Sequence, residues 1–339
     1  MGKANTAANA SLYYEAGQTL VSNVAMTDSG DHKKFTTASA AVWSDRSGFE
    51  ASVRPDGLIT GGVITPDVGT SDSVDVAALT CYLAGVLTSV DAASVGSLDR
   101  PSASPTGLKI IVSIIVNSSG TLVSLAGTEG ASFSTTRGAE GGPPLITAGA
   151  IEIGQVKLNS STPAEVTAAE IFQVVGSSQE RWDYPTWAEY PEGENGGYGY
   201  IQLVEALPAV HAGSPATYKQ VYIEYYTPVF AMLDPVSDFI PPETSHSQKS
   251  TTVYGGALGS SEASINQGSF RAFLKTGVTE NILTLKNEKL WFKFYPDRNS
   301  APYVLAQGTL GISRTFPAGD SIQANCTVSA VSAAQERAS

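Results

Sequence analysis

Segments rich in β-branched and aromatic residues recur along the chain, separated by turn residues. Residues 107–116 read GLKIIVSIIV and precede the turn residues 117–120, which predicts a core strand and a hairpin to residues 121–126. Residues 150–158 alternate apolar and polar side chains with a change of phase at Gly154, which predicts a strand with a bulge. The chain is therefore expected to be mainly β, as a β-sandwich or β-barrel with one or two short helices.

The C-terminal half carries further strand signals and one helix signal. Thr162, Pro163 and Glu165 supply a hydroxyl, a proline and an acid in the order typical of a helix start, which predicts a helix at about 163–173. Residues 74–90 fit either a second helix or strands. The other segments expected to be strands are 217–227, 290–295, 303–312 and 321–332.

The chain has few charged residues, most of them acidic, and this limits the classes of function that it can have. Charged residues make up only 15% of the 339 residues, and 32 acids against 20 basic residues give a net charge of -12. A conventional nucleic-acid-binding protein needs a basic surface that displaces counterions, and this chain has no basic surplus. No run of 18 apolar residues occurs, so no membrane interaction is expected.

Three stretches rich in glycine and proline are expected to be long loops, at 127–149, 180–215 and 234–250. Loops of this length in a compact chain are usually functional or ordered by a partner. The second combines Trp182 and Trp187 with several acids, which fits either a partner-contacting loop or a carbohydrate cleft with paired carboxylates.

Signals for catalysis are otherwise weak. His32, His211 and His246 have no metal-ligand spacing, and Cys81 and Cys326 are too isolated for a metal site. The two cysteines are expected to be buried free thiols, with a single bridge as the alternative. The chain is expected to be no enzyme and to use no cofactor.

Residues 303–332, YVLAQGTLGISRTFPAGDSIQANCTVSAVS, resemble the end of the major tail tube proteins of long-tailed bacteriophages. The likeness covers about 30 residues and consists of a strand, a turn and a final alternating strand. The residues that carry it are Gly308, Leu310, Ile312, Ser313, Pro317, Gly319, Asp320, Ser321 and Ile322. The resemblance implies a structural virion protein of a siphophage-type tail, made in the host cytoplasm, that polymerises into stacked rings for genome delivery.

A weak internal sequence similarity bears on the domain organisation. Gly62, Pro66 and the run from Asp72 repeat the order of parts seen at residues 311–322. We therefore expect two β domains, 1–158 and 159–339, the second with the helix at about 163–173. Two tube-type domains in tandem would form trimeric rings with pseudo-six-fold symmetry, whereas one enlarged domain would form hexameric rings.

The tube interpretation assigns two groups of candidate site residues. Residues from the 180–215 loop are the candidates for contacts between stacked rings: Trp182, Tyr184, Trp187, Tyr190, Glu192 and Glu194. Residues 55–99 contain no Lys or Arg, and acids in this stretch are the candidates for a channel wall: Asp56, Asp67, Asp72 and Asp75. An acidic wall would repel double-stranded DNA passing without specific binding, although aspartates that cap turns explain the same positions.

The expected partners are copies of the same chain and other phage tail proteins. A head decoration protein and a tail-tip adhesin are alternatives of the same broad class. A carbohydrate-active β-sandwich enzyme that uses the aromatic and acidic loop is the alternative of a different class.

Overall fold

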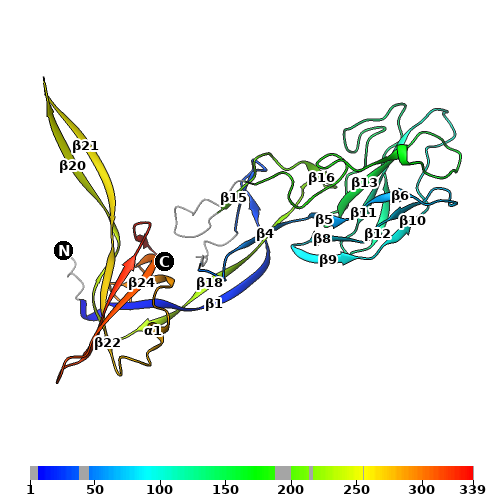
Figure 1. Ribbon diagram of the computed structural model, residues 1–339. Helices are drawn as coiled ribbons and strands as arrows, with labels where there is room; N and C mark the ends of the chain where they lie inside the picture. The colour runs from blue at the N-terminus through cyan, green and yellow to red at the C-terminus, as the bar shows by residue number, and fades with distance from the viewer. Residues whose placement is uncertain (1–6, 38–45, 188–199, 214–216, 255, 339) are drawn as a thin grey trace.

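The computed structural model describes residues 7–37, 46–187, 200–213, 217–254 and 256–338 and is mainly β, as predicted. A long two-stranded ribbon links a group of curled strands at one end to a separate group of strands at the other (Figure 1). A hairpin projects from the first group, next to the C-terminus (Figure 1). The helical elements are short: η1 (Ala7–Asn9), η2 (Ala168–Glu170) and α1 (Asn281–Thr284).

The largest sheet has nine strands, in the order β19-β22-β25-β24-β23-β1-β18-β4, with β26 on β24. All its pairings are antiparallel. The strands are β1 (Ser11–Ala25), β4 (Ser52–Pro55), β18 (Val221–Leu233), β19 (Val236–Ile240), β22 (Gly268–Leu274), β23 (Lys289–Tyr295), β24 (Tyr303–Thr315), β25 (Ile322–Ser329) and β26 (Gln335–Arg337). Strands predicted at 290–295, 303–312 and 321–332 are confirmed as β23, β24 and β25.

Six of these strands curl round one apolar core and form what we call the barrel: β19, β22, β25, β24, β23 and the start of β1. Alternate side chains, among them Leu12, Phe292 and Val328, point into this core and are fully buried. The row of strands curls until β19, at one edge, approaches the start of β1, although the two strands do not pair among the described residues. A single apolar face on each strand is therefore enough to build the barrel.

The ribbon consists of β1 and β18, paired from Leu12 with Leu233 to Ala25 with Tyr222. One face of β18 serves two cores, since Leu233 packs on the barrel core while Ile223 and Tyr225 belong to another core. This second core, the neck, also holds Phe35 and Ile201. Its short strands are β2 (Thr27–Asp28), β3 (Lys34–Thr36), β15 (Tyr200–Gln202), β16 (Ala209–His211) and β17 (Thr217–Tyr218).

Residues 57–186 form a separate group of strands with its own core, which we call the lobe. Ile114, Val156 and Leu58 lie in this core with at most 2% of their surface exposed. Its strands are β5 (Gly57–Gly61), β6 (Ile64–Pro66), β7 (Val74–Val76), β8 (Leu79–Leu83), β9 (Val86–Val90), β10 (Ala93–Val95), β11 (Ile110–Val116), β12 (Leu122–Ala126), β13 (Ile151–Leu158) and β14 (Ile171–Phe172).

The lobe confirms several sequence predictions. β11 and β12 form the predicted hairpin. β13 has a register shift between Gly154 and Glu152, so the predicted bulge lies beside Gly154. Residues 74–90 are strands, which settles the alternative left open for that segment.

The helix predicted at about 163–173 is wrong. Glu165, expected to support a first helical turn, instead accepts a hydrogen bond from the Gly69 backbone at 2.9 Å. Only the turn η2 forms, with Thr167 and Glu170 as a capping box, and the chain then extends into β14 and pairs with β13. Contacts with neighbouring segments thus outweigh a local helix signal.

The core clusters divide the chain differently from the expected ranges 1–158 and 159–339. β1, near the N-terminus, pairs with β18 and β23 from the C-terminal half. β13 and β14 lie on opposite sides of the expected boundary yet pair in the lobe. Both cysteines are free and buried, Cys81 in the lobe core and Cys326 in the barrel core.

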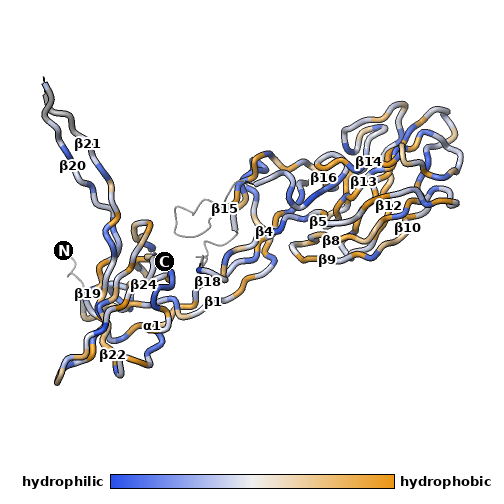
Figure 2. Tube along the Cα trace, viewed as in Figure 1, coloured by the Kyte–Doolittle hydropathy of each residue, from blue (hydrophilic) through white to orange (hydrophobic). Residues whose placement is uncertain are grey.

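Residues 234–250 were predicted to be a loop, but they form β19 and most of β20 (Glu243–Val253). β20 pairs with β21 (Gly256–Asn266) in register from Glu243 with Asn266 to Val253 with Gly256. We call this projecting hairpin the arm; Figure 1 shows it leaving the barrel, and Figure 2 shows mostly hydrophilic or neutral residues along it.

Candidate assembly surfaces

The described side chains of the arm have no apolar support from the rest of the chain. Its described side chains are exposed except for Ser245 and Ile265, which are half-buried. None of the arm's described residues belongs to a core cluster. A two-stranded hairpin alone in water is marginally stable, and its unpaired edges are templates for another strand. The arm is therefore the surface whose stability would increase most on binding a partner.

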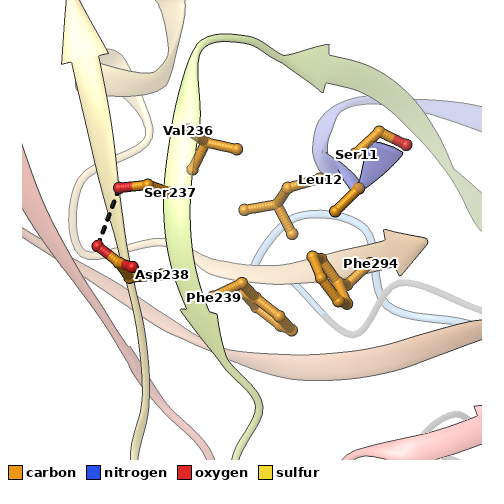
Figure 3. Close-up of a pocket in the computed structure, with 8 residues that line it drawn as sticks. Ser11, Leu12, Val236, Ser237, Asp238, Phe239 and Phe294 are labelled. Carbon is orange, nitrogen blue, oxygen red and sulfur yellow. Dashed lines mark hydrogen bonds between the residues drawn. The ribbon is translucent and has the colours of Figure 1, made fainter. Parts of the chain in front are cut away.

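A second surface lies at the seam of the barrel, where β19 approaches β1 and, in the described ranges, the two strands are not hydrogen-bonded to each other. A cavity of about 300 Å³ opens there, lined mainly by Leu12, Val236, Phe239 and Phe294. Figure 3 shows the two phenylalanine rings beside Leu12, and the rings stack with centroids 4.7 Å apart. The seam exposes apolar surface next to a sheet edge.

The described stacking candidates, Trp182, Tyr184 and Trp187, lie where the lobe meets the neck. Trp182 and Trp187 are half-buried and in ring contact, with centroids 5.6 Å apart. Trp182 also packs edge-on against Tyr82, and Tyr184 is exposed. Tyr190, Glu192 and Glu194 lie outside the described residues. The two tryptophans hold the lobe against the neck, and their role in stacking stays a prediction.

The channel-wall candidates do not form one exposed surface. Asp56 is only 3% exposed, so this acid is a buried group rather than part of a solvent-facing wall. Asp72 pairs with Arg100, and Asp75 accepts a hydrogen bond from Ser94 at 2.6 Å. Asp67 is half-buried and its backbone closes a turn with Thr70. None of these contacts is a bond from the side chain to the backbone of a local turn, and the role of Asp67, Asp72 and Asp75 in a channel wall stays a prediction.

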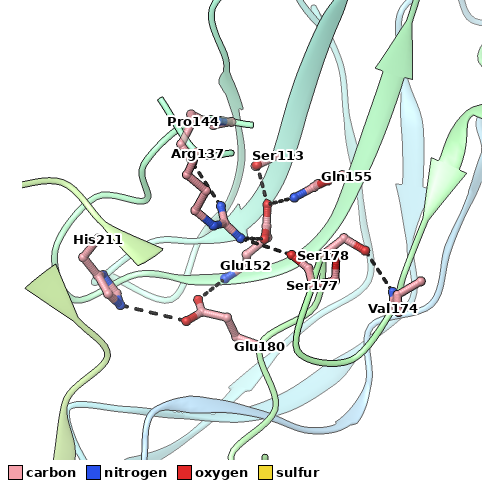
Figure 4. A network of polar contacts seen from close by, with 10 residues as sticks. All are labelled: Ser113, Arg137, Pro144, Glu152, Gln155, Val174, Ser177, Ser178, Glu180 and His211. Carbon is pink, nitrogen blue, oxygen red and sulfur yellow. Dashed lines mark hydrogen bonds and ion pairs between the residues drawn. The ribbon is translucent and has the colours of Figure 1, made fainter. Parts of the chain in front are cut away.

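A buried polar network in the lobe was missed by sequence reasoning. The carboxylate of Glu152, in β13, is fully buried and bonded to Arg137, Ser113 and Gln155 (Figure 4). Burial raises the pKa of Glu152, and the Arg137 guanidinium opposes that rise. Arg137 also donates to the Pro144 carbonyl of the same loop at 3.0 Å. Its bond to Glu152 in β13 attaches the 127–149 loop to the sheet. No local pattern announces such a network, because its members come from separate segments.

A second buried group of charges lies where the lobe meets the neck. The ammonium of Lys219 donates to the carbonyls of Arg181 and Tyr184, both at 2.7 Å. Burial lowers the pKa of Lys219 to about 8, opposed by the nearby Glu180, Asp56 and Asp183. Burial raises the pKa of Asp56 to about 7, with Glu180 adding to the rise.

The described part of the 180–215 segment contains three acids, Glu180, Asp183 and Glu205. Asp183 accepts two hydrogen bonds from Arg181, which lower its pKa. Glu180 borders a cavity of about 20 Å³, room for about one water molecule. Among the described residues, no group of three or more His, Cys, Asp or Glu side chains could hold a metal ion.

Comparisons of the chain with protein-family models, with curated proteins and with solved structures found no match. In the described ranges, no helix has both the length and the apolar character needed to cross a membrane.

Proposed function

We propose that this chain is a structural virion protein that polymerises into stacked rings and forms the tail tube of a siphophage-type particle. The observation that carries the proposal is the arm, a long hairpin that projects from the barrel without a core of its own. A structure of this kind is stabilised when a neighbouring subunit covers its edges and faces. In the proposed tube, the arm reaches into the next ring.

Further features support the assembly. The large sheet ends in β19 and β4, each with one unpaired edge available to a neighbour. A head-to-tail contact between such edges generates a closed ring when its rotation closes. The net charge of -12 keeps the assembled wall from binding DNA that passes through it. We propose that each ring contains either three or six copies of the chain.

Shortening the arm tests the proposal. Replacement of residues 248–261 by Asn-Gly leaves Ser247 opposite Glu262, where a two-residue turn can close the hairpin. Negative-stain microscopy of the concentrated full-length chain should show tubes or stacked rings with a central hole. The shortened variant should show single rings or monomers with an unchanged β circular dichroism spectrum.

A matched control shortens a hairpin that the proposal does not use. Replacement of residues 117–121 by Asn-Gly joins Val116 to Leu122 at the end of the β11–β12 hairpin in the lobe. This variant should assemble like the unmodified chain. Tubes of normal length from the shortened-arm variant would show that the arm does not make the ring-to-ring contact. Monomers from the unmodified chain at every concentration would contradict the tube itself.

A further inference from the structure

The contact between the lobe and the ribbon is built around buried ionisable side chains. Asp56 is the residue at which the chain leaves β4 for the lobe, and Lys219 stands just before β18. The two positions are adjacent, since the Asp56 backbone donates to the Gln220 carbonyl at 3.2 Å. Asp56 is 3% exposed and Lys219 is 4% exposed. We call this contact the joint.

Lys219 binds the base of the lobe through its side chain alone. Its ammonium lies between the carbonyls of Arg181 and Tyr184, and this segment is also held by the Trp182 backbone donating to Leu58 at 3.2 Å. Asp56 reaches the lobe from the other side, where its carboxylate accepts from the Gly85 backbone at 3.3 Å. On each side of the joint one titratable side chain thus makes a direct hydrogen bond to the lobe, beside the backbone bonds that join Ile146 of the lobe to Val210 and Ala212 of the neck.

The charges within the joint do not balance. The groups that face Asp56 are Glu180 and Lys219, together with the Cys81 thiol from β8 and the Tyr222 phenol from β18. Lys219 also faces Asp183, whose own partner is Arg181. When Asp56 carries a proton, Lys219 and Glu180 compensate each other. When Asp56 is ionised, two buried carboxylates share one ammonium, and the second carboxylate carries an uncompensated cost.

Glu180 has a further neighbour on the neck. Its Oε1 lies 4.0 Å from Nε2 of His211 in β16 (Figure 4), and within the described residues neither atom has a hydrogen-bond partner. The other oxygen, Oε2, accepts from the Glu152 backbone at 2.8 Å. His211 therefore faces a carboxylate across the same joint.

We propose that the joint is a pH-operated hinge: with Asp56 protonated the lobe is held firmly against the ribbon, and loss of that proton loosens the contact. The proposal is independent of tube assembly, because it concerns one chain.

The pKa values fix the direction and the range of the response. The pKa of Asp56 is about 7 in the closed joint and 3.8 when solvated, so closure is favoured at low pH and that advantage is lost as the pH rises to about 7. The pKa of Lys219 is about 8 when closed and 10.5 when solvated, so closure regains stability as the pH rises from about 8 towards 10.5. The joint should be loosest between about pH 7 and 8.

Hydrogen exchange on the full chain measures this opening. The reporting amides are those of Asp56, which donates across the joint to the Gln220 carbonyl, and of Gly85, which donates to the Asp56 carboxylate. After correction for intrinsic exchange, the opening constant should rise by up to about tenfold per pH unit between pH 5 and 7 and level off near pH 7. Amides of β11 inside the lobe core should show no such profile.

Two variants test whether Asp56, rather than another acid, causes the rise of the opening constant with pH. Asp56→Asn keeps an oxygen for the Gly85 amide but cannot ionise, so the rise between pH 5 and 7 should disappear. Asp75→Asn, an acid of the same lobe bonded to Ser94, should leave the rise unchanged. A titration of the Asp56 carboxyl carbon by nuclear magnetic resonance in the unmodified chain decides the matter if Asp56→Asn does not fold. A midpoint below pH 5, or the same rise in Asp56→Asn, would overturn the proposal.

Discussion

Glu152 illustrates how one buried carboxylate organises several segments of the lobe. Its oxygens are bonded to Arg137 from the 127–149 loop, to Ser113 from the neighbouring β11 and to Gln155 from its own strand. The ring of donors balances the cost of placing an ionised group where no solvent reaches it. The long loop is therefore attached to the sheet by a charge pair as well as by the apolar packing of Ile146 on Ile115.

Removal of the partner charge should be costly. In Arg137→Met the carboxylate of Glu152 stays buried without its cation, and unfolding by urea should show a loss of about 3 kcal/mol at neutral pH. Because burial already raises the pKa of Glu152, the variant should regain stability in acid, where the carboxyl is neutral in both states.

The double variant Arg137→Met with Glu152→Gln is the control for this prediction. It removes both charges, so it should recover part of the lost stability at neutral pH. Equal stability of Arg137→Met and the unmodified chain would show that the pair is not structurally important.

At the scale of single elements, local patterns predicted the strands that are rich in apolar residues and buried. β11 and β13 are bounded by turn residues and rich in apolar side chains, so the sequence was sufficient to place them. The arm escaped prediction because both of its faces are exposed and no alternation marks it. Pro235, Pro241 and Pro242 near its base also indicated a loop. The joint escaped prediction because Asp56, Glu180 and Lys219 meet only through the fold.

The arm should change its exchange behaviour on assembly. In the free chain its amides are paired only with each other, so they should exchange quickly through fraying. In assembled tubes, arm amides should exchange at least tenfold more slowly, as measured by hydrogen exchange with mass spectrometry. Peptides from β11 serve as the internal reference. Equal exchange of the arm in both states would contradict its burial by a neighbour.

At the scale of the whole molecule, the chain is an extended body rather than a sphere (Figure 1). Three separate core clusters, in the barrel, the neck and the lobe, follow one another along its length. This arrangement could not be predicted from the sequence, since β1 and β18 are far apart in the chain and pair only in the folded protein. Mainly β character was predictable; the insertion of the lobe between β4 and β18 was not.

The extended shape predicts the scattering of the free chain. A compact domain of this length would have a radius of gyration of about 20 Å. Small-angle X-ray scattering of the monomer at low concentration should give a clearly larger value. A value near that of a compact domain would show that the lobe folds back onto the barrel in solution. The shortened-arm variant measures how much the arm contributes to the radius of gyration.

Each of the two large cores contains one sulfhydryl, Cys81 in the lobe and Cys326 in the barrel. Burial raises their pKa values to about 11 and about 12, so neither thiol reacts with an alkylating reagent while its core is intact. The protein therefore carries a natural chemical label in each half. In partially denatured samples, the order in which the two sites become alkylated reports which half opens first.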